Sequence, residues 1–169
     1  DAAARAAALA RLERWCDDVV GADGLVAAGH RVVHGGPDHG EPVVVDERVL
    51  ADLDSLVPLA PLHLPHSLAP IRALRSARPS LVQVACFDTS FHRGRPSAME
   101  RYGLPEALYR QGIRRYGFHG LSYESVAASL RTVAPAVADG RVIVAHLGAG
   151  ASLCAIHRGR SIDTTMGFS

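Results

Sequence analysis

Asp88 is a candidate for chemistry because it follows directly on a short apolar run. Residues 81–87 are rich in Val and end in Phe, which predicts a strand buried on both faces. In open α/β sheets, ligands bind beyond the carboxyl ends of the strands, so a carboxylate at that point can act on a ligand. The alternative is that Asp88, Thr89 and Ser90 only turn the chain by hydrogen-bonding their own backbone.

Arg31 lies near the end of another predicted strand, residues 25–34, just before a Gly-Gly pair. Alternation places Arg31 and Val33 on one face of this strand and Val32 and His34 on the other. A guanidinium in such a position is costly to desolvate and usually has an anionic partner. That partner is either a ligand or a structural carboxylate.

His119 lies ahead of a helix that we expect to begin at Ser122 as its N-cap and to run to Thr132. The N–H groups and the dipole of a helix N-terminus favour an anion, and an imidazole beside them can donate a hydrogen bond to that anion. A histidine that satisfies a loop carbonyl is the alternative.

A tight turn with two glycines follows the predicted strand 141–146, in the order His146, Leu147, Gly148, Ala149, Gly150. Two glycines so close together let backbone N–H groups face a phosphate. Most such turns are only hairpins. We also expect strands at 151–156 and 160–165 to pair with each other across residues 157–159.

The remaining elements place these candidates in an α/β fold. We expect a first helix whose stripe of Leu9, Leu12, Cys16 and Val19 is buried, and a short strand at 42–45. A helix capped by Asp46 and another that begins at Ser67 follow, with a proline-fixed loop, residues 59–65, between them. Strand then helix then strand is the order of an α/β protein. Residues 93–111 have no clear pattern apart from one helical turn at 105–109.

Composition excludes several classes of function. A net charge of +1 over 169 residues supplies no overall field for nucleic acid or for an acidic membrane surface. No apolar run approaches the roughly 18 residues that span a bilayer. The three cysteines are far apart and have apolar neighbours, so we expect reduced core thiols, which favours the cytosol.

Five segments together resemble the acetate and propionate kinase family, in the same order and with similar spacing over nearly the whole chain. They are residues 30–36, 87–92, 116–120, 146–152 and 163–168. The resemblance implies two lobes of the actin, Hsp70 and sugar-kinase type around a nucleotide cleft. It also implies a reversible transfer of the terminal phosphoryl of ATP to acetate or propionate, with Mg²⁺, giving acyl phosphate and ADP in a cytoplasmic homodimer.

The resemblance assigns roles to individual residues. It implies that Arg31 binds carboxylate and phosphoryl groups, that Asp88 is an essential acid, and that His119 donates a hydrogen bond in the transition state. Val33 and Leu62 correspond to the pocket for the alkyl end of the substrate. The phosphate-binding turn corresponds to His146, Leu147, Gly148, Ala149 and Gly150.

The resemblance also has departures and gaps. Ala149 replaces an Asn in the family's turn, and Leu64 replaces an Asn after the histidine of the proline loop. The family's first strand, a second arginine, the adenosine loops and a magnesium-binding glutamate have no counterpart in these residues. We therefore expect residues 1–87 to be most of an N-terminal lobe and residues 88–169 the start of a nucleotide-binding lobe, inactive as an isolated fragment.

Two other functions are open from the residues alone. A phosphatase with Asp88 as covalent nucleophile needs a second acid two residues on, where this chain has Ser90. A non-catalytic nucleotide-binding or metal-binding fragment would use the pairs His30/His34 or His63/His66. His30 and His34 on a strand are too far apart to chelate one ion together, which counts against zinc.

Overall fold

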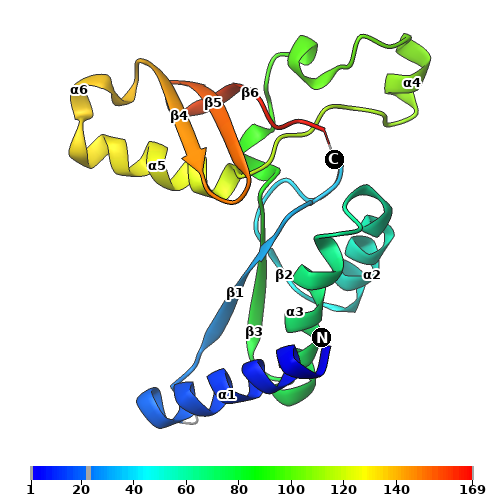
Figure 1. Ribbon diagram of the computed structural model, residues 1–169, viewed down its shortest axis with the longest axis vertical. Helices are drawn as coiled ribbons and strands as arrows, with labels where there is room; N and C mark the ends of the chain where they lie inside the picture. Colours follow the sequence, from blue (N-terminus) through cyan, green and yellow to red (C-terminus); the bar gives the residue numbers. More distant parts are fainter. Residues whose placement is uncertain (1, 22–23, 169) are drawn as a thin grey trace. The chain divides into compact units, whose positions relative to one another are not determined.

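The computed structural model describes residues 2–21 and 24–168, and the chain divides into two compact units. The first unit comprises residues 1–32 and 42–86. The second comprises residues 33–41 and 87–169, so the chain passes from one unit to the other three times. Helices and strands occur together in both, which confirms the α/β class (Figure 1).

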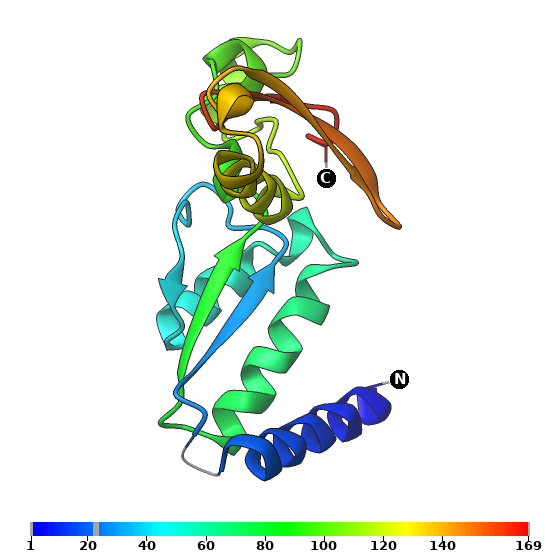
Figure 2. The same ribbon diagram turned by 90° about the vertical axis from the view of Figure 1, so that its left-hand side faces the viewer.

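The first unit is built on a three-stranded sheet in the order β1 (Ala27–Val32), β3 (Val82–Phe87), β2 (Val43–Val44). Strands β1 and β3 run in the same direction (Figure 2). Strand β2 pairs antiparallel to β3, with Val43 opposite Ala85. On β3 one face is buried and the other is half-buried or exposed, so the expectation of burial on both faces was wrong. A sheet with only two long strands leaves part of one face uncovered.

Helices α2 (Glu47–Ser55) and α3 (Leu64–Ala77) supply most of the core of this unit. Asp46 caps α2 as expected, because its carboxylate accepts a hydrogen bond from Val49 N at 2.7 Å. Helix α3 begins at Leu64 rather than at Ser67, with Pro65 in its first turn. Proline fits this place because N–H groups in the first turn of a helix have no acceptor within the helix, so the N–H that proline lacks is not needed there. The preceding loop contains a short 3₁₀ helix, η1 (Val57–Leu59).

Helix α1 (Ala2–Val20) differs from the expectation of a buried stripe. Leu12 and Val19 are more than half exposed. Helix α1 contacts α3, and Asp17 accepts two hydrogen bonds from Arg78 at 2.6 and 2.7 Å. A helical period in the sequence thus predicted the helix correctly but not its burial.

The second unit contains an antiparallel sheet of β4 (Arg141–Leu147), β5 (Ala151–His157) and β6 (Arg160–Thr164). This confirms the three strands expected in this region and their hairpin connections. Helix α5 (Gly120–Val133) covers one face of the sheet, and α6 (Pro135–Ala138) follows it (Figure 1). Shorter elements lie between β3 and α5, namely η2 (Ser90–His92), η3 (Ser97–Glu100) and α4 (Glu106–Arg110).

The core of the second unit lies between α5 and the sheet. Its buried side chains are Tyr123, Ala127, Val144, Cys154 and Ile156. The three cysteines are free thiols as expected, but only Cys154 is fully buried, since Cys16 and Cys86 are half-exposed. Within the residues that the structure describes, no helix has both the length and the apolar character needed to cross a membrane.

Candidate functional site

Asp88 follows the last residue of β3, as the sequence predicted, and its side chain is buried. Its carbonyl oxygen accepts a hydrogen bond from Gly120 N at 2.9 Å, which ties the end of β3 to the first residue of α5. The hydroxyl of Thr89 accepts a hydrogen bond from Gly35 N at 3.1 Å. Asp88 and Thr89 therefore connect distant segments of the chain and do more than turn it locally.

His119 is the N-cap residue of α5 and has a left-handed backbone conformation, with φ 60° and ψ 20°. The helix begins at Gly120, so Ser122 is not its N-cap and that expectation was wrong. The reason is the long-range bond from Gly120 N to the Asp88 carbonyl, which sequence spacing cannot reveal. The expectation that His119 lies just ahead of a helix N-terminus is confirmed.

The ring of His119 is held by a serine hydroxyl on β5. Its Nδ1 lies 2.8 Å from Ser152 Oγ, and Ser152 Oγ lies 2.5 Å from the hydroxyl of Tyr123. If Tyr123 donates to Ser152 and Ser152 donates to Nδ1, the ring proton is on Nε2. In that arrangement the Nε2 atom of His119 is an N–H donor.

His146 stacks on His119, with ring centroids 4.0 Å apart and planes 24° apart. The Nδ1 of His146 lies 3.0 Å from Ser122 Oγ. Ser122 therefore orients an imidazole instead of capping the helix. Hydroxyls of two serines thus orient the two stacked rings. Neither serine was predicted from the sequence to have this role.

The turn of Gly148, Ala149 and Gly150 connects β4 to β5 and is exposed. A Cβ added to Gly150 would lie 3.3 Å from His119 Nε2, and one added to Gly148 would lie 3.0 Å from His146 Nε2. Neither glycine has a positive φ. Glycine at these two positions thus makes room for the imidazoles, and an exposed turn beside two imidazoles suits the phosphates of a nucleotide.

Arg31, Leu62 and Val33 are divided between the units. Arg31, near the end of β1, and Leu62, which precedes α3, belong to the first unit, and both are exposed. Val33 is half-buried and belongs to the second unit, with Asp88, His119 and the turn. Strand β1 ends at Val32 and not at residue 34 as expected, but the predicted alternation of faces holds across its end, because Val32 and His34 are fully buried while Arg31 is exposed and Val33 is half-buried.

His92 supports the segment that carries His119 and was not identified from the sequence. Its ring is buried, with Nδ1 at 2.8 Å from Ser161 Oγ and Nε2 at 2.9 Å from the carbonyl oxygen of Phe118. Burial lowers the pKa of His92 to about 4, and the charges of Arg95 and Arg115 act in the same direction. A neutral imidazole therefore links η2 to β6 and to the residue before His119.

Solved structures that are similar to this chain include a propionate kinase and acetate kinases. A propionate kinase from Francisella tularensis superposes with a TM-score of 0.88 at 37% identity, over 96% of this chain and 42% of that one. An acetate kinase from Entamoeba histolytica gives a TM-score of 0.83 at 36% identity, over 97% of this chain and 42% of the other. The fold of the described residues is thus the α/β fold of these two-lobed enzymes, in part.

The model of the acetokinase family matches residues 2–169, and the chain belongs to that family. It is 59% identical to an acetate kinase of Nitrobacter hamburgensis over 85% of this chain and 36% of that protein. It is 52% identical to an acetate kinase of Methylocella silvestris over 100% of this chain and 42% of that protein. The chain therefore spans about two fifths of the length of these relatives.

Proposed function

We propose that the chain forms part of the active site of an ATP-dependent kinase that phosphorylates a short carboxylate, acetate or propionate, reversibly. The observation that carries this proposal is the linked arrangement in the second unit. Gly120 joins Asp88 to the start of α5, and the ring of His119 lies against Gly150 of the turn and stacks on His146. The family and the names of the relatives support the class of reaction.

The chemistry requires positive charge and hydrogen-bond donors between two anions. Two unit charges about 4 Å apart repel by roughly 4 kcal/mol at an effective dielectric of 20, which is about a thousandfold in rate. Arg31 would grip the carboxylate through its planar fork, and His119 would donate from Nε2 to the transferring phosphoryl group. Mg²⁺, when bound with the nucleotide, would neutralise phosphate oxygens.

Asp88 would organise the site without accepting a proton, because a carboxylate substrate is already ionised and needs no general base. Val33 and Leu62 would contact the alkyl end of the substrate. The turn of residues 146–150 would bind the nucleotide phosphates through its backbone, since Ala149 offers no side-chain amide. The acidic ligands for Mg²⁺ would come from outside these residues.

The same proposal covers the organisation of the protein. Residues 1–87 would be most of the N-terminal lobe and residues 88–169 the start of the nucleotide-binding lobe. The protein would work in the cytoplasm as a homodimer, and the isolated chain of 169 residues would be inactive because it holds only part of the site.

The test is an ATP-dependent hydroxamate assay on acetate, propionate and butyrate. It is run on the longest natural form of the protein and on this chain alone. We expect Mg²⁺-dependent and ATP-dependent acyl hydroxamate from the long form with at least one of the acids. No hydroxamate from any of the acids would contradict the proposal.

Asp88→Asn is the most informative substitution in this assay. We expect turnover to fall by about a hundredfold or more, because the amide has no charge with which to orient arginine or metal-bound water. Binding of ATP, measured by calorimetry, should change little. Unchanged turnover would remove Asp88 from the mechanism.

A further inference from the structure

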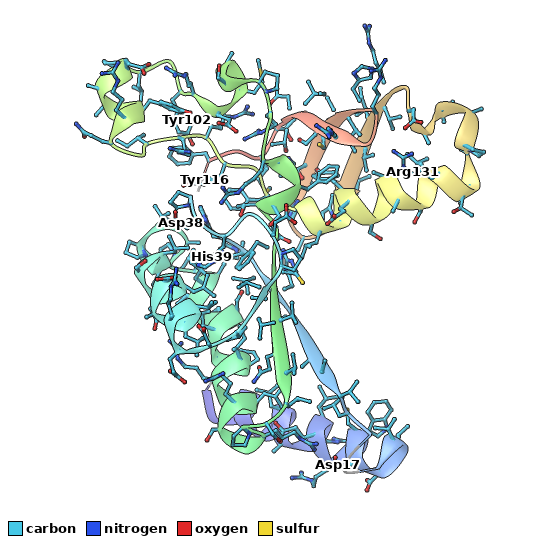
Figure 3. All side chains as sticks on the ribbon, turned by 180° about the vertical axis from the view of Figure 1, so that it is seen from behind. Asp17, Asp38, His39, Tyr102, Tyr116 and Arg131 are labelled. Atoms are coloured by element: carbon cyan, nitrogen blue, oxygen red, sulfur yellow. The ribbon has the colours of Figure 1, made fainter. Side chains whose placement is uncertain are left out.

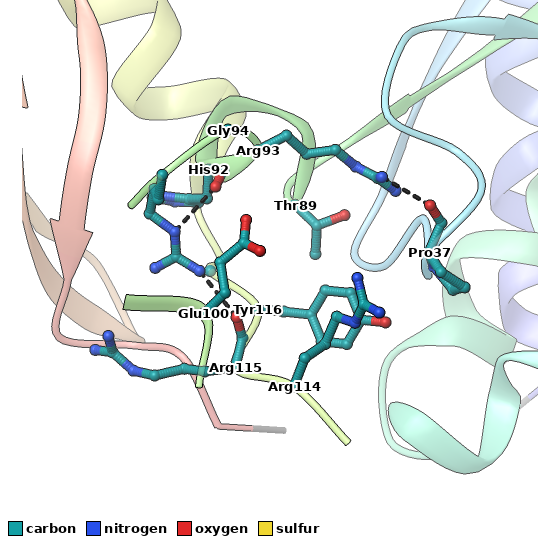
Figure 4. A pocket seen from close by; sticks show the side chains of 11 residues that line it. Pro37, Thr89, His92, Arg93, Gly94, Glu100, Arg114, Arg115 and Tyr116 are labelled. Carbon is teal, nitrogen blue, oxygen red and sulfur yellow. Dashed lines mark hydrogen bonds between the residues drawn. The ribbon is translucent and has the colours of Figure 1, made fainter. Parts of the chain in front are cut away.

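A cavity of about 250 Å³ lies entirely within the second unit, and neither Asp88, His119 nor the turn of residues 146–150 lines it. Figure 4 shows Thr89, Glu100, Arg114 and Tyr116 around it. Its size is just below the 300–1,000 Å³ that is typical of pockets for drug-sized ligands. It therefore suits an ion of a few heavy atoms.

The lining of this cavity has an excess of positive charge. Four arginines line it, Arg93, Arg95, Arg114 and Arg115, against the single carboxylate of Glu100. Arg115 is paired with Asp163 at 2.7 Å. The other three form no ion pair within the described part of the chain. Arg93 donates to the carbonyl oxygens of Gly36 and Pro37, which are neutral acceptors. Figure 4 shows the bond to Pro37.

Arg95 is the most deeply buried of these cations, with 6% of its surface exposed. Its Nε donates to the carbonyl of His92 and its Nη2 to the carbonyl of Arg115, both at 2.9 Å. Its Nη1 is buried and has no hydrogen-bond partner among the described residues. Burial and the charge of Arg115 lower the pKa of Arg95, and they outweigh the opposite effect of the Glu100 and Asp163 carboxylates.

Arg114 repeats this pattern. Its Nε is buried and also has no hydrogen-bond partner among the residues that the structure covers. Its guanidinium carbon lies 5.3 Å from the centre of the Tyr109 ring, which is a weak interaction for a cation. A buried N–H of a charged group that lacks an acceptor is costly, so such groups usually have a ligand or water as partner.

We propose that this cavity binds a small oxyanion through the guanidinium groups of Arg95 and Arg114, which line it and form no ion pair among the described residues. The ligand chemistry is a pair of anionic oxygens, from a phosphate group or from a short dicarboxylate, since guanidinium groups bind both in forked geometry. The negative charge of Glu100 repels an anion, so it opposes the binding of highly charged anions in the cavity. Thr89 lines the cavity and follows Asp88, so the bound anion lies next to the segment that carries the candidate catalytic acid.

The test is calorimetric titration of the protein in its longest natural form, with inorganic phosphate and, separately, with malonate. We expect saturable binding of at least one of them at low ionic strength. Arg114→Gln should weaken that binding by about tenfold or more, the amount expected for a lost charge-assisted hydrogen bond. Arg114 makes no hydrogen bond to the rest of the described chain that its loss would break, so the variant should fold.

Arg95→Gln is the second variant and should weaken the same titration by a similar factor. Arg110→Gln is the matched control, because it removes an exposed arginine on α4 that does not line the cavity and pairs with Glu106 at 3.5 Å. The control should bind as the unchanged protein does. Loss of phosphate binding in Arg114→Gln identifies a phosphate site, and loss of malonate binding identifies a carboxylate site.

Two results would overturn the proposal. One is the absence of saturable binding of both anions. The other is binding that persists unchanged in folded Arg114→Gln and Arg95→Gln proteins, which would place the anion elsewhere, for example at the turn of residues 146–150. Neither result bears on the hydroxamate assay, so the proposed kinase activity stands or falls separately.

Discussion

His119 has a backbone conformation that is unusual for a residue with a side chain. The left-handed region costs a non-glycine residue about 1–2 kcal/mol, so neighbouring contacts must hold it there. Its carbonyl oxygen accepts hydrogen bonds from Ser122 N at 3.1 Å and from Tyr123 N at 3.2 Å. The strain occurs where the imidazole is directed toward Gly150, and such strain is often found at functional sites.

Ser152→Ala tests whether the orientation of this imidazole matters. The variant removes the hydroxyl that contacts both His119 Nδ1 and Tyr123 OH. We expect turnover in the hydroxamate assay to fall about tenfold or more, with a smaller change in KM, because the ring must donate only as charge develops. Ser129→Ala, which removes an exposed hydroxyl on α5, is the control. Equal turnover in the two variants would mean that Ser152 does not position His119.

At the scale of elements, the junction between β3 and α5 depends on a glycine. A Cβ added to Gly120 would lie 2.1 Å from the carbonyl oxygen of Asp88, which Gly120 N already binds. The clash would be with backbone and not with a flexible side chain. Gly120→Ala must therefore break the bond between Gly120 N and the Asp88 carbonyl or move α5. We expect the free energy of unfolding to fall by about 3 kcal/mol, as measured by urea denaturation.

Gly103→Ala is the control for this substitution, because nothing lies within 4 Å of a Cβ added there and its φ is not positive. Its free energy of unfolding should stay within about 0.5 kcal/mol of the unchanged protein. If Gly120→Ala is as stable as Gly103→Ala, the contact between Asp88 and α5 does not hold this junction.

Elements that depend on local signals were predicted from the sequence, and the junction between β3 and α5 was not. Strands β4, β5 and β6 were predicted because alternation and turn residues are local signals. The cap of α2 by Asp46 is local as well. The start of α5 was placed at Ser122 because serine is a good N-cap residue. That placement was wrong because the bond from Gly120 N to the Asp88 carbonyl joins residues far apart in the chain, which local sequence does not reveal.

At the scale of the whole molecule, burial and charge clusters were harder to predict than elements. Residues 93–111 have no periodic pattern, yet Arg95 and Glu100 from this segment line a cavity with Arg114 and Arg115. Spacing in the sequence gave no reason to join them. The first helix has a clear apolar stripe, yet Leu12 is exposed, because periodicity predicts a face without saying what covers it.

Two buried histidines of the second unit make its stability depend on pH. Burial lowers the pKa of both His34 and His92 to about 4, with the charge of Arg93 adding to the effect on His34. The unfolded chain binds protons on these rings near pH 6.5, whereas the folded unit binds them only near pH 4. The stabilisation is therefore complete above pH 6.5 and is lost as the pH falls toward 4.

Each imidazole would contribute at most about 3 kcal/mol, a large part of the 5–15 kcal/mol that is typical of a domain. We expect the free energy of unfolding, measured in urea between pH 7 and pH 4.5, to fall steeply, with an uptake of nearly two protons near pH 5. His92→Leu should reduce that uptake by about one proton even though it also lowers stability at pH 7. His66→Leu, which removes an exposed imidazole of the first unit, controls for the loss of a histidine. An uptake that is the same in all three proteins would mean that Ser161 and the Phe118 carbonyl do not hold a neutral ring in the core.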